Sequence, residues 1–179
     1  GATLTSARRV FELVDAPPAV VEPARPAPMP ASFAIRFEQV RLRYAPDAPW
    51  ALDRVDLELA QGERLAIVGE SGAGKSSLVA ALQKFYPLQD GRILFGGRSV
   101  DELCGDDLRR RIAVIDQRTH LFNTSLLDNL LLAAPGARAE QIERAVLDAQ
   151  LDGFVAGLPE GFETVLGEGG SRVSGGEAR

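Results

Sequence analysis

The segment that most constrains this chain is residues 69–76 (GESGAGKS), which fits the pattern G-x-x-x-x-G-K-[ST]. A short apolar run, residues 64–68 (RLAIV), precedes it, and a segment with helical spacing, residues 75–85, follows. Strand, glycine-rich turn and helix in this order predict a phosphate-binding loop (P-loop) in an α/β fold. The glycines let backbone N–H groups turn toward phosphate oxygens, and the helix N-terminus adds a favourable field. The alternative, a glycine-rich turn before an ordinary helix, does not explain why every fixed position of the pattern matches.

The side chains of this loop predict distinct roles toward a nucleotide. Lys75 is expected to reach the β- and γ-phosphates, and the Ser76 hydroxyl is expected to ligate Mg²⁺. Ser77 adds a further hydroxyl near the α-phosphate. The residues expected to bind the nucleotide here are Gly69, Glu70, Ser71, Gly72, Ala73, Gly74, Lys75, Ser76 and Ser77.

Composition limits the other kinds of site. Of the 179 residues, 45% are apolar and 25% are charged, which is enough to bury a core. The net charge of −5 disfavours a nucleic-acid-coating protein, because binding phosphates over a large surface needs a basic face. A single cysteine and a single histidine exclude an internal disulfide and a zinc site built from several such side chains. We therefore expect His120 to be a loop residue and Cys104 a small buried side chain.

Three zones follow one another along the chain. Residues 7–15 have the apolar spacing of a short amphipathic helix, and six prolines within residues 16–30 predict an extended, semi-stiff linker. From residue 33 apolar and polar side chains alternate as in a strand, with a change of face at Glu38 and Gln39 that predicts a bulge. Further strands are expected at residues 55–59, 64–68, 92–95 and 112–115, and helices at residues 75–85, 126–132, 138–150 and 151–156.

Three more features accompany the P-loop, and together the four resemble the ATP-binding domains of exporter-type ABC transporters. Tyr44 lies 25 residues before Gly69, where these domains carry an aromatic side chain that stacks on adenine. Gln117 follows the expected strand at 112–115, like the glutamine of the Q-loop. Residues 174–177 (SGGE) match the ABC signature.

The resemblance implies roles for these residues. It implies that ATP and Mg²⁺ bind, that Tyr44 stacks on the base, and that Gln117 joins Ser76 at the metal and Lys75 in catalysis. For Tyr44 the plainer alternative is a strand-end tyrosine packed against Trp50 or Pro46. In the family, the signature faces the ATP of an opposing subunit; here Ser174, Gly175 and Gly176 would do so.

The resemblance also implies an architecture and partners. The fold class would be a P-loop core with an antiparallel β subdomain and an α-helical signature subdomain. Residues 1–15 would be the end of a transmembrane helix, residues 16–32 a linker, and residues 33–179 the ATP-binding domain. Its partners would be a second ABC subunit, forming a heterodimer, and the transmembrane domain of the same full-length chain, at the cytoplasmic face of a bacterial inner membrane.

Two segments, residues 117–135 and 167–176, look closer to one subgroup, the CydC-type subunit of the cysteine/glutathione exporter required for cytochrome bd assembly. A lipid or drug exporter is the alternative cargo class. A nucleotide-binding fragment that does not hydrolyse ATP is the other alternative.

The sequence given ends before the Walker B strand of the family, whose Asp-Glu pair supports Mg²⁺ and polarises the attacking water. Without a positioned base, the rate is expected to fall by about 10²–10⁴. We therefore expect negligible hydrolysis by this 179-residue chain and ATPase activity in the full-length protein. We also expect uncovered apolar surface on the neighbours of that strand.

Overall fold

The computed structural model describes residue 11, residues 14–115 and residues 120–167. The chain divides into two compact units, residues 1–113 and 114–179, which are described separately here. None of the helices within the described ranges is long and apolar enough to cross a bilayer. The expected helix at residues 7–15 lies mostly outside those ranges.

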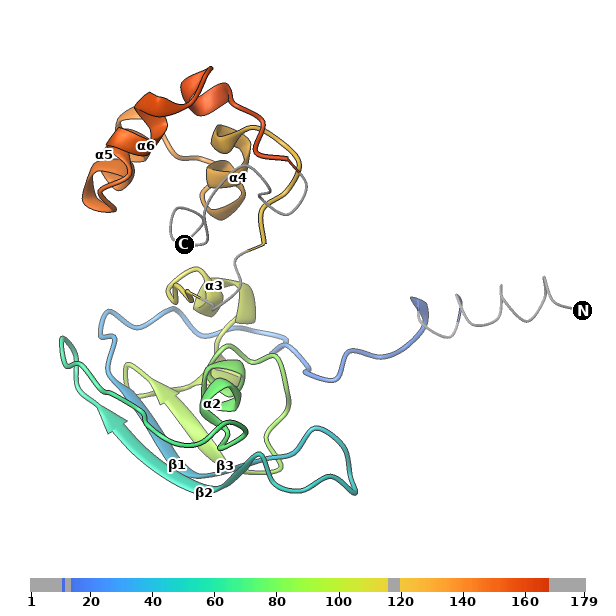
Figure 1. The fold of residues 1–179 in the computed structure, drawn as a ribbon. Coiled ribbons are helices and arrows are strands. Elements are labelled where there is room, and N and C mark those ends of the chain that lie inside the picture. The colour runs from blue at the N-terminus through green and yellow to red at the C-terminus, as the bar shows by residue number, and fades with distance from the viewer. Residues whose placement is uncertain (1–10, 12–13, 116–119, 168–179) are drawn as a thin grey trace, which may run out of the picture. The chain divides into compact units, whose positions relative to one another are not determined.

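A four-stranded antiparallel sheet forms the base of the first unit (Figure 1). Its strand order is β2-β1-β3-β4. The strands are β1 (Ile35–Leu42), β2 (Leu52–Leu59), β3 (Asp90–Phe95) and β4 (Arg98–Ser99). The strands expected from alternation at 55–59 and 92–95 are thus present, each extended at its start.

The expected bulge in the first strand is confirmed. The pairing of β1 with β2 shifts register between Phe37 and Val40, and Gln39 has a φ of 50°. The backbone N–H of Gln39 donates to Asp56 Oδ1 on β2 at 2.8 Å. Because of the extra residue, Phe37, Val40 and Leu42 all reach the same buried core despite their uneven spacing.

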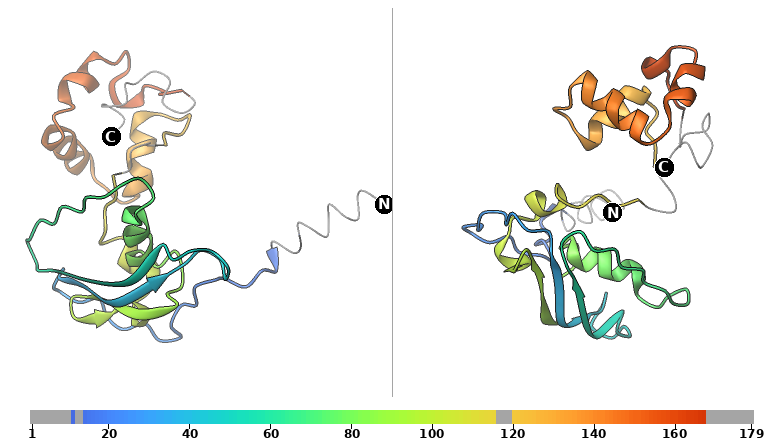
Figure 2. Two further views of the ribbon diagram at one scale, coloured as in Figure 1. Left: turned by 60° about the horizontal axis from the view of Figure 1, so that its bottom comes forward. Right: turned by 90° about the vertical axis from the view of Figure 1, so that its left-hand side faces the viewer.

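Helix α2 (Lys75–Leu82) covers one face of this sheet (Figures 1 and 2). Its Ala81 is buried, and Leu78 and Leu82 pack against the core from above the strands. The short elements η1 (Val100–Glu102) and α3 (Gly105–Arg109) contribute further buried side chains. The fully buried core residues include Val40, Leu42, Ile93, Leu103 and Leu108.

The second unit is helical, as the apolar spacing predicts. It contains α4 (Leu126–Ala133), α5 (Ala139–Asp148), α6 (Asp152–Gly157) and η2 (Gly161–Glu163). The segments before α4 and after η2 are joined by two hydrogen bonds: the Leu126 N–H donates to the Thr164 carbonyl at 3.0 Å, and the Leu166 N–H to the Thr124 carbonyl at 3.2 Å.

Two expected strands are not formed. Residues 64–68 and 112–115 lie in neither a helix nor a strand, and no strand of the described ranges pairs with them. Their apolar side chains are largely exposed, with Val68 at 90% and Ile115 at 78%. The prediction was wrong because an apolar run becomes a strand only beside a neighbour that accepts its backbone hydrogen bonds. The uncovered apolar surface itself was expected.

Helix α2 also ends earlier than expected, at Leu82 rather than Phe85. The Lys84 N–H donates to Ala81 O and the Phe85 N–H to Ala80 O, which is the hydrogen-bond pattern of a Schellman motif. Lys84 occupies the left-handed position of this motif, with φ 58°, where glycine is the usual residue.

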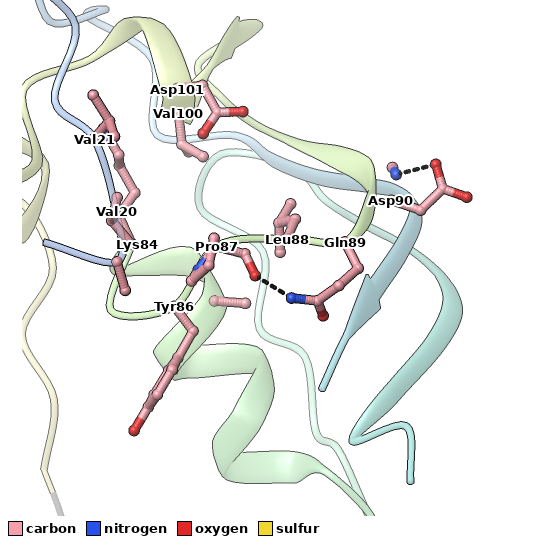
Figure 3. Close-up of a pocket in the computed structure, with 13 residues that line it drawn as sticks. Val20, Val21, Lys84, Tyr86, Pro87, Leu88, Gln89, Asp90, Val100 and Asp101 are labelled. Atoms are coloured by element: carbon pink, nitrogen blue, oxygen red, sulfur yellow. Dashed lines mark hydrogen bonds between the residues drawn. The ribbon is translucent and has the colours of Figure 1, made fainter. Parts of the chain in front are cut away.

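The side chain of Lys84 explains why a lysine stands there. It is almost fully buried, and its Nζ donates to Leu103 O at 2.9 Å and to Glu22 Oε2 at 3.2 Å. Glu22 Oε2 also accepts the N–H of Gly105 at 3.0 Å. A second tie joins the segments where the Ala27 N–H donates to Glu102 O. These bonds therefore hold the proline-rich segment against the end of α2. A cavity of about 410 Å³ lies beside this contact, and Val20 and Lys84 are among the residues that line it (Figure 3).

This fastening predicts a pH-dependent contribution to stability. The pKa of Glu22 is lowered, mainly by the hydrogen bond from Gly105 and further by Lys84, against the opposing effect of burial. The carboxylate therefore stabilises the fold above its unfolded-state pKa, and this is lost as the pH falls through the lowered folded-state pKa. Near neutral pH, Glu22→Gln should reduce the free energy of unfolding by about 1 kcal/mol, since Glu22 is half-exposed.

Urea titration at several pH values measures the effect. The control is Glu102→Gln, since the Glu102 side chain has no ion pair or hydrogen bond among the described residues. A difference between wild type and Glu22→Gln that is equally large below the lowered pKa would contradict this account.

Candidate functional site: the glycine-rich loop before α2

The loop at residues 69–74 leads into α2 without a side-chain cap. Gly74 is the N-cap residue in a left-handed conformation with φ 84°, and no side chain hydrogen-bonds to the first turn. The N–H groups of Lys75, Ser76 and Ser77 have no acceptor within the described part of the chain. Three unpaired donors and the positive end of the helix dipole thus meet at one place, an arrangement that suits an anion.

Gly74 is held close to the strand region. A Cβ at this position would lie 2.3 Å from the carbonyl oxygen of Ala51 and 3.3 Å from Leu52 Cδ2. Gly72 has a similar φ of 86°, but a Cβ there would meet nothing within 4 Å. The close approach at Gly74 therefore fixes the start of α2 against the start of β2.

The Lys75 side chain folds back over the loop. Its Nζ donates to the carbonyl oxygens of Gly69 at 2.8 Å and Glu70 at 2.6 Å. The Ala73 N–H donates to Glu70 O at 3.2 Å, which closes the turn. The ammonium group thus lies over the loop that precedes the unpaired N–H groups, and it adds positive charge to this loop.

The two serines after Lys75 lie in different surroundings. Ser76 is exposed, and its hydroxyl has no partner among the described residues. Ser77 is buried, and its Oγ lies 2.8 Å from the hydroxyl of Tyr44. One exposed hydroxyl oxygen at a helix start that suits an anion could ligate a hard cation such as Mg²⁺, although the described residues hold no cluster of three acidic, His or Cys side chains for a metal.

Tyr44 stands just beyond the end of β1, half-exposed and next to α2. Its ring meets the ring of Tyr86 edge to face, with centroids 4.7 Å apart and planes at 83°. Trp50, the packing partner of the plainer alternative, instead contacts the guanidinium groups of Arg41 and Arg43, whose carbons lie 4.5 and 4.8 Å from its ring centroid.

The remaining residues singled out in the sequence fall into two groups. Gln117, Ser174, Gly175 and Gly176 lie outside the described residues. His120 is exposed, and its ring contacts Phe122 edge to face, in agreement with a loop role. Cys104 precedes α3 and is partly buried.

Sequence reasoning missed three contributors to this region. The Ala51 carbonyl enters through backbone position alone, and no sequence signal marks it. Tyr86 is set apart only by being, with Tyr44, one of two tyrosines in the chain. Lys84 occupies a position with positive φ that normally favours glycine, so nothing in the sequence predicts a helix end there.

Comparison with known proteins identifies the family. The ABC transporter family model matches residues 52–179, most of the chain and all of the loop. The chain belongs to the ABC transporter family.

Its relatives are exporters. It is 38% identical over 174 residues to the ATP-dependent lipid A-core flippase of Chromohalobacter salexigens, covering 97% of this chain and 30% of the relative. It is 40% identical over 143 residues to the alpha-hemolysin translocation ATP-binding protein HlyB of Escherichia coli, covering 80% of this chain and 20% of that protein. A structure of a bacterial Atm1-family ABC exporter with ATP bound matches with a TM-score of 0.90 and 34% identity, over 98% of this chain and 31% of that one. The chain thus spans about a third or less of these relatives.

These findings confirm the α/β fold class of an ABC nucleotide-binding domain and the exporter type. ABC domains of this family bind ATP, typically with Mg²⁺. None of the relatives described above is a CydC-type subunit, so the finer likeness is not shown by them.

The close approach of Gly74 to Ala51 can be tested by comparing alanine substitutions at Gly72 and Gly74. Gly72→Ala should cost about 1 kcal/mol of stability, because it places a side chain at positive φ in open space. Gly74→Ala should cost about 2–4 kcal/mol, because it adds a collision with Ala51 O to the same strain. Thermal unfolding of the two variants measures the difference, and equal losses would show that the backbone contact is not tight.

Proposed function

We propose that this chain is the ATP-binding part of an ABC exporter subunit that couples ATP binding and hydrolysis to transport. The observation that supports this most is the start of α2, which has unpaired N–H groups and the exposed Ser76 hydroxyl and follows a loop that carries the Lys75 ammonium. All three suit the phosphates of a nucleotide with its Mg²⁺.

In this proposal different residues bind different parts of the Mg²⁺-nucleotide. The N–H groups of the first turn of α2 hold phosphate oxygens, and Lys75 leaves the carbonyls of Gly69 and Glu70 to pair with the β- and γ-phosphates. The Ser76 hydroxyl holds Mg²⁺, which supplies charge neutralisation on the phosphate oxygens. Tyr44 stacks on adenine, since its ring is half-exposed beside the same helix.

The remaining roles follow the family resemblance. Gln117 would join the metal ligands, and Ser174, Gly175 and Gly176 would contact ATP held by the P-loop of an opposing ABC subunit. A transmembrane domain of the full-length chain would carry the cargo at the cytoplasmic face of the membrane, with residues 16–32 as the connection.

Two cargo classes have support. The likeness of residues 117–135 and 167–176 to the CydC-type subunit supports cysteine or glutathione. The relative named as a lipid A-core flippase, similar over nearly the whole chain, supports a lipid.

Replacing the loop lysine tests the nucleotide site. Lys75→Ala should raise the Kd for ATP by about 10- to 100-fold, because charge-assisted hydrogen bonds to the phosphates are lost. Calorimetry measures this Kd.

Hydrolysis is a separate prediction. In the 179-residue chain, phosphate release should stay below about 0.1 s⁻¹, against the 1–10³ s⁻¹ usual for enzymes, whereas the full-length protein should hydrolyse ATP. A phosphate-release assay measures both rates.

A matched control for the lost cation is Arg98→Ala on β4, away from the loop, which should leave ATP binding unchanged. Wild-type ATP affinity in Lys75→Ala would remove the loop from the proposed function.

The cargo is tested with the full-length protein in lipid vesicles. Glutathione should stimulate its ATPase rate if thiols are exported, because cargo binding favours the state that hydrolyses ATP. Stimulation by lipid A and not by glutathione would instead support the lipid alternative. Oxidised and reduced glutathione, compared at equal concentration, show whether the free thiol matters.

A further inference from the structure

Tyr44 has little support of its own from the sheet. It lies two residues past the end of β1, outside any strand, and its side chain is 51% exposed. A stacking platform in such a position would swing between rotamers unless other groups hold its ring. The described residues offer two such groups, one at the hydroxyl and one at the ring.

At the hydroxyl end, Tyr44 Oη and Ser77 Oγ are 2.8 Å apart. Ser77 is buried in the first turn of α2, directly after the residue expected to ligate Mg²⁺. This bond ties the expected base site to the helix that forms the phosphate site.

At the ring, Tyr86 provides the second attachment through the edge-to-face contact at 4.7 Å. Tyr86 is well placed to be rigid, because it stands between the Schellman turn at Lys84 and Phe85 and the fixed φ of Pro87. Its side chain runs along α2 and away from Val20, Val21 and the other labelled cavity residues (Figure 3). The Tyr86 hydroxyl has no hydrogen-bond partner among the described residues, so its ring makes the contact.

We propose that Tyr86 is a positioning residue for nucleotide binding, holding the Tyr44 ring in the orientation that receives the base. This rests on the proposed function, in which Tyr44 stacks on adenine. Tyr86 itself touches no nucleotide; it lowers the cost of ordering Tyr44 when the base arrives. Its effect must therefore appear only with ligands that carry a base, and only while Tyr44 is present.

The experiment measures Kd by calorimetry on the full-length protein, with ATP and with inorganic tripolyphosphate, without Mg²⁺ so that turnover does not interfere. Tyr86→Ala should weaken ATP binding about two- to tenfold, the range of an aromatic pair, and leave tripolyphosphate binding unchanged. Tyr86→Phe should bind ATP as wild type does. Tyr86→Leu, which keeps the volume without the aromatic ring, should resemble Tyr86→Ala and serves if the alanine variant fails to fold.

Phe85→Ala is the matched control. Phe85 is the neighbouring aromatic residue with a similar exposure of 53% against 42% for Tyr86, but its ring faces the guanidinium group of Arg109. This variant should leave ATP affinity unchanged.

A double-mutant cycle tests the route of the effect. In a Tyr44→Ala background, which should itself weaken ATP but not tripolyphosphate binding, Tyr86→Ala should have no further effect. The inference is overturned if Tyr86→Ala binds ATP as wild type does, if it weakens tripolyphosphate equally, or if its effect persists without Tyr44.

Measuring Lys75→Ala with the same two ligands separates this inference from the proposed function. If Lys75→Ala weakens both ligands while Tyr86→Ala weakens neither, the nucleotide site stands and the role of Tyr86 fails. If Lys75→Ala weakens neither ligand, the nucleotide site fails, and the role of Tyr86 fails with it.

Discussion

The contact between Gly74 and the Ala51 carbonyl is the constraint on which the site depends. It presses the start of α2 against the start of β2, so that only a residue without a Cβ fits. The unpaired N–H groups of the first turn are thereby placed by the sheet and not by the loop. A flexible loop alone would not hold several donors at one point, because ordering each residue costs about 1–2 kcal/mol.

The opposite end of α2 is held by a different kind of interaction. The buried Lys84 ammonium joins the helix end to the Leu103 carbonyl and to Glu22, in a segment 62 residues earlier in the chain. The helix at the proposed phosphate site is thus fixed at both ends. A movement of α2 would displace the proline-rich segment directly, because Glu22 of that segment contacts Lys84 at the end of the helix.

Local patterns predicted much of this structure. The uneven alternation around Gln39 located a bulge, the P-loop pattern located the start of α2, and apolar spacing located the helices of the second unit. The failures have a shared cause, which is dependence on distant groups. Residues 64–68 lack a pairing neighbour in the described ranges, and Lys84 tolerates a positive φ because of Glu22 and Leu103. Neither partner is visible from neighbouring residues in the sequence.

The exposed run at residues 64–68 has a consequence for the behaviour of the chain in solution. The backbone amide and carbonyl groups of this run have no partner within the described ranges, and Val68 faces water, so another copy of the chain can add a strand here. The residues that lead into the proposed phosphate site are therefore also open to self-association. We therefore expect the apparent size of this 179-residue chain in solution to rise with its concentration.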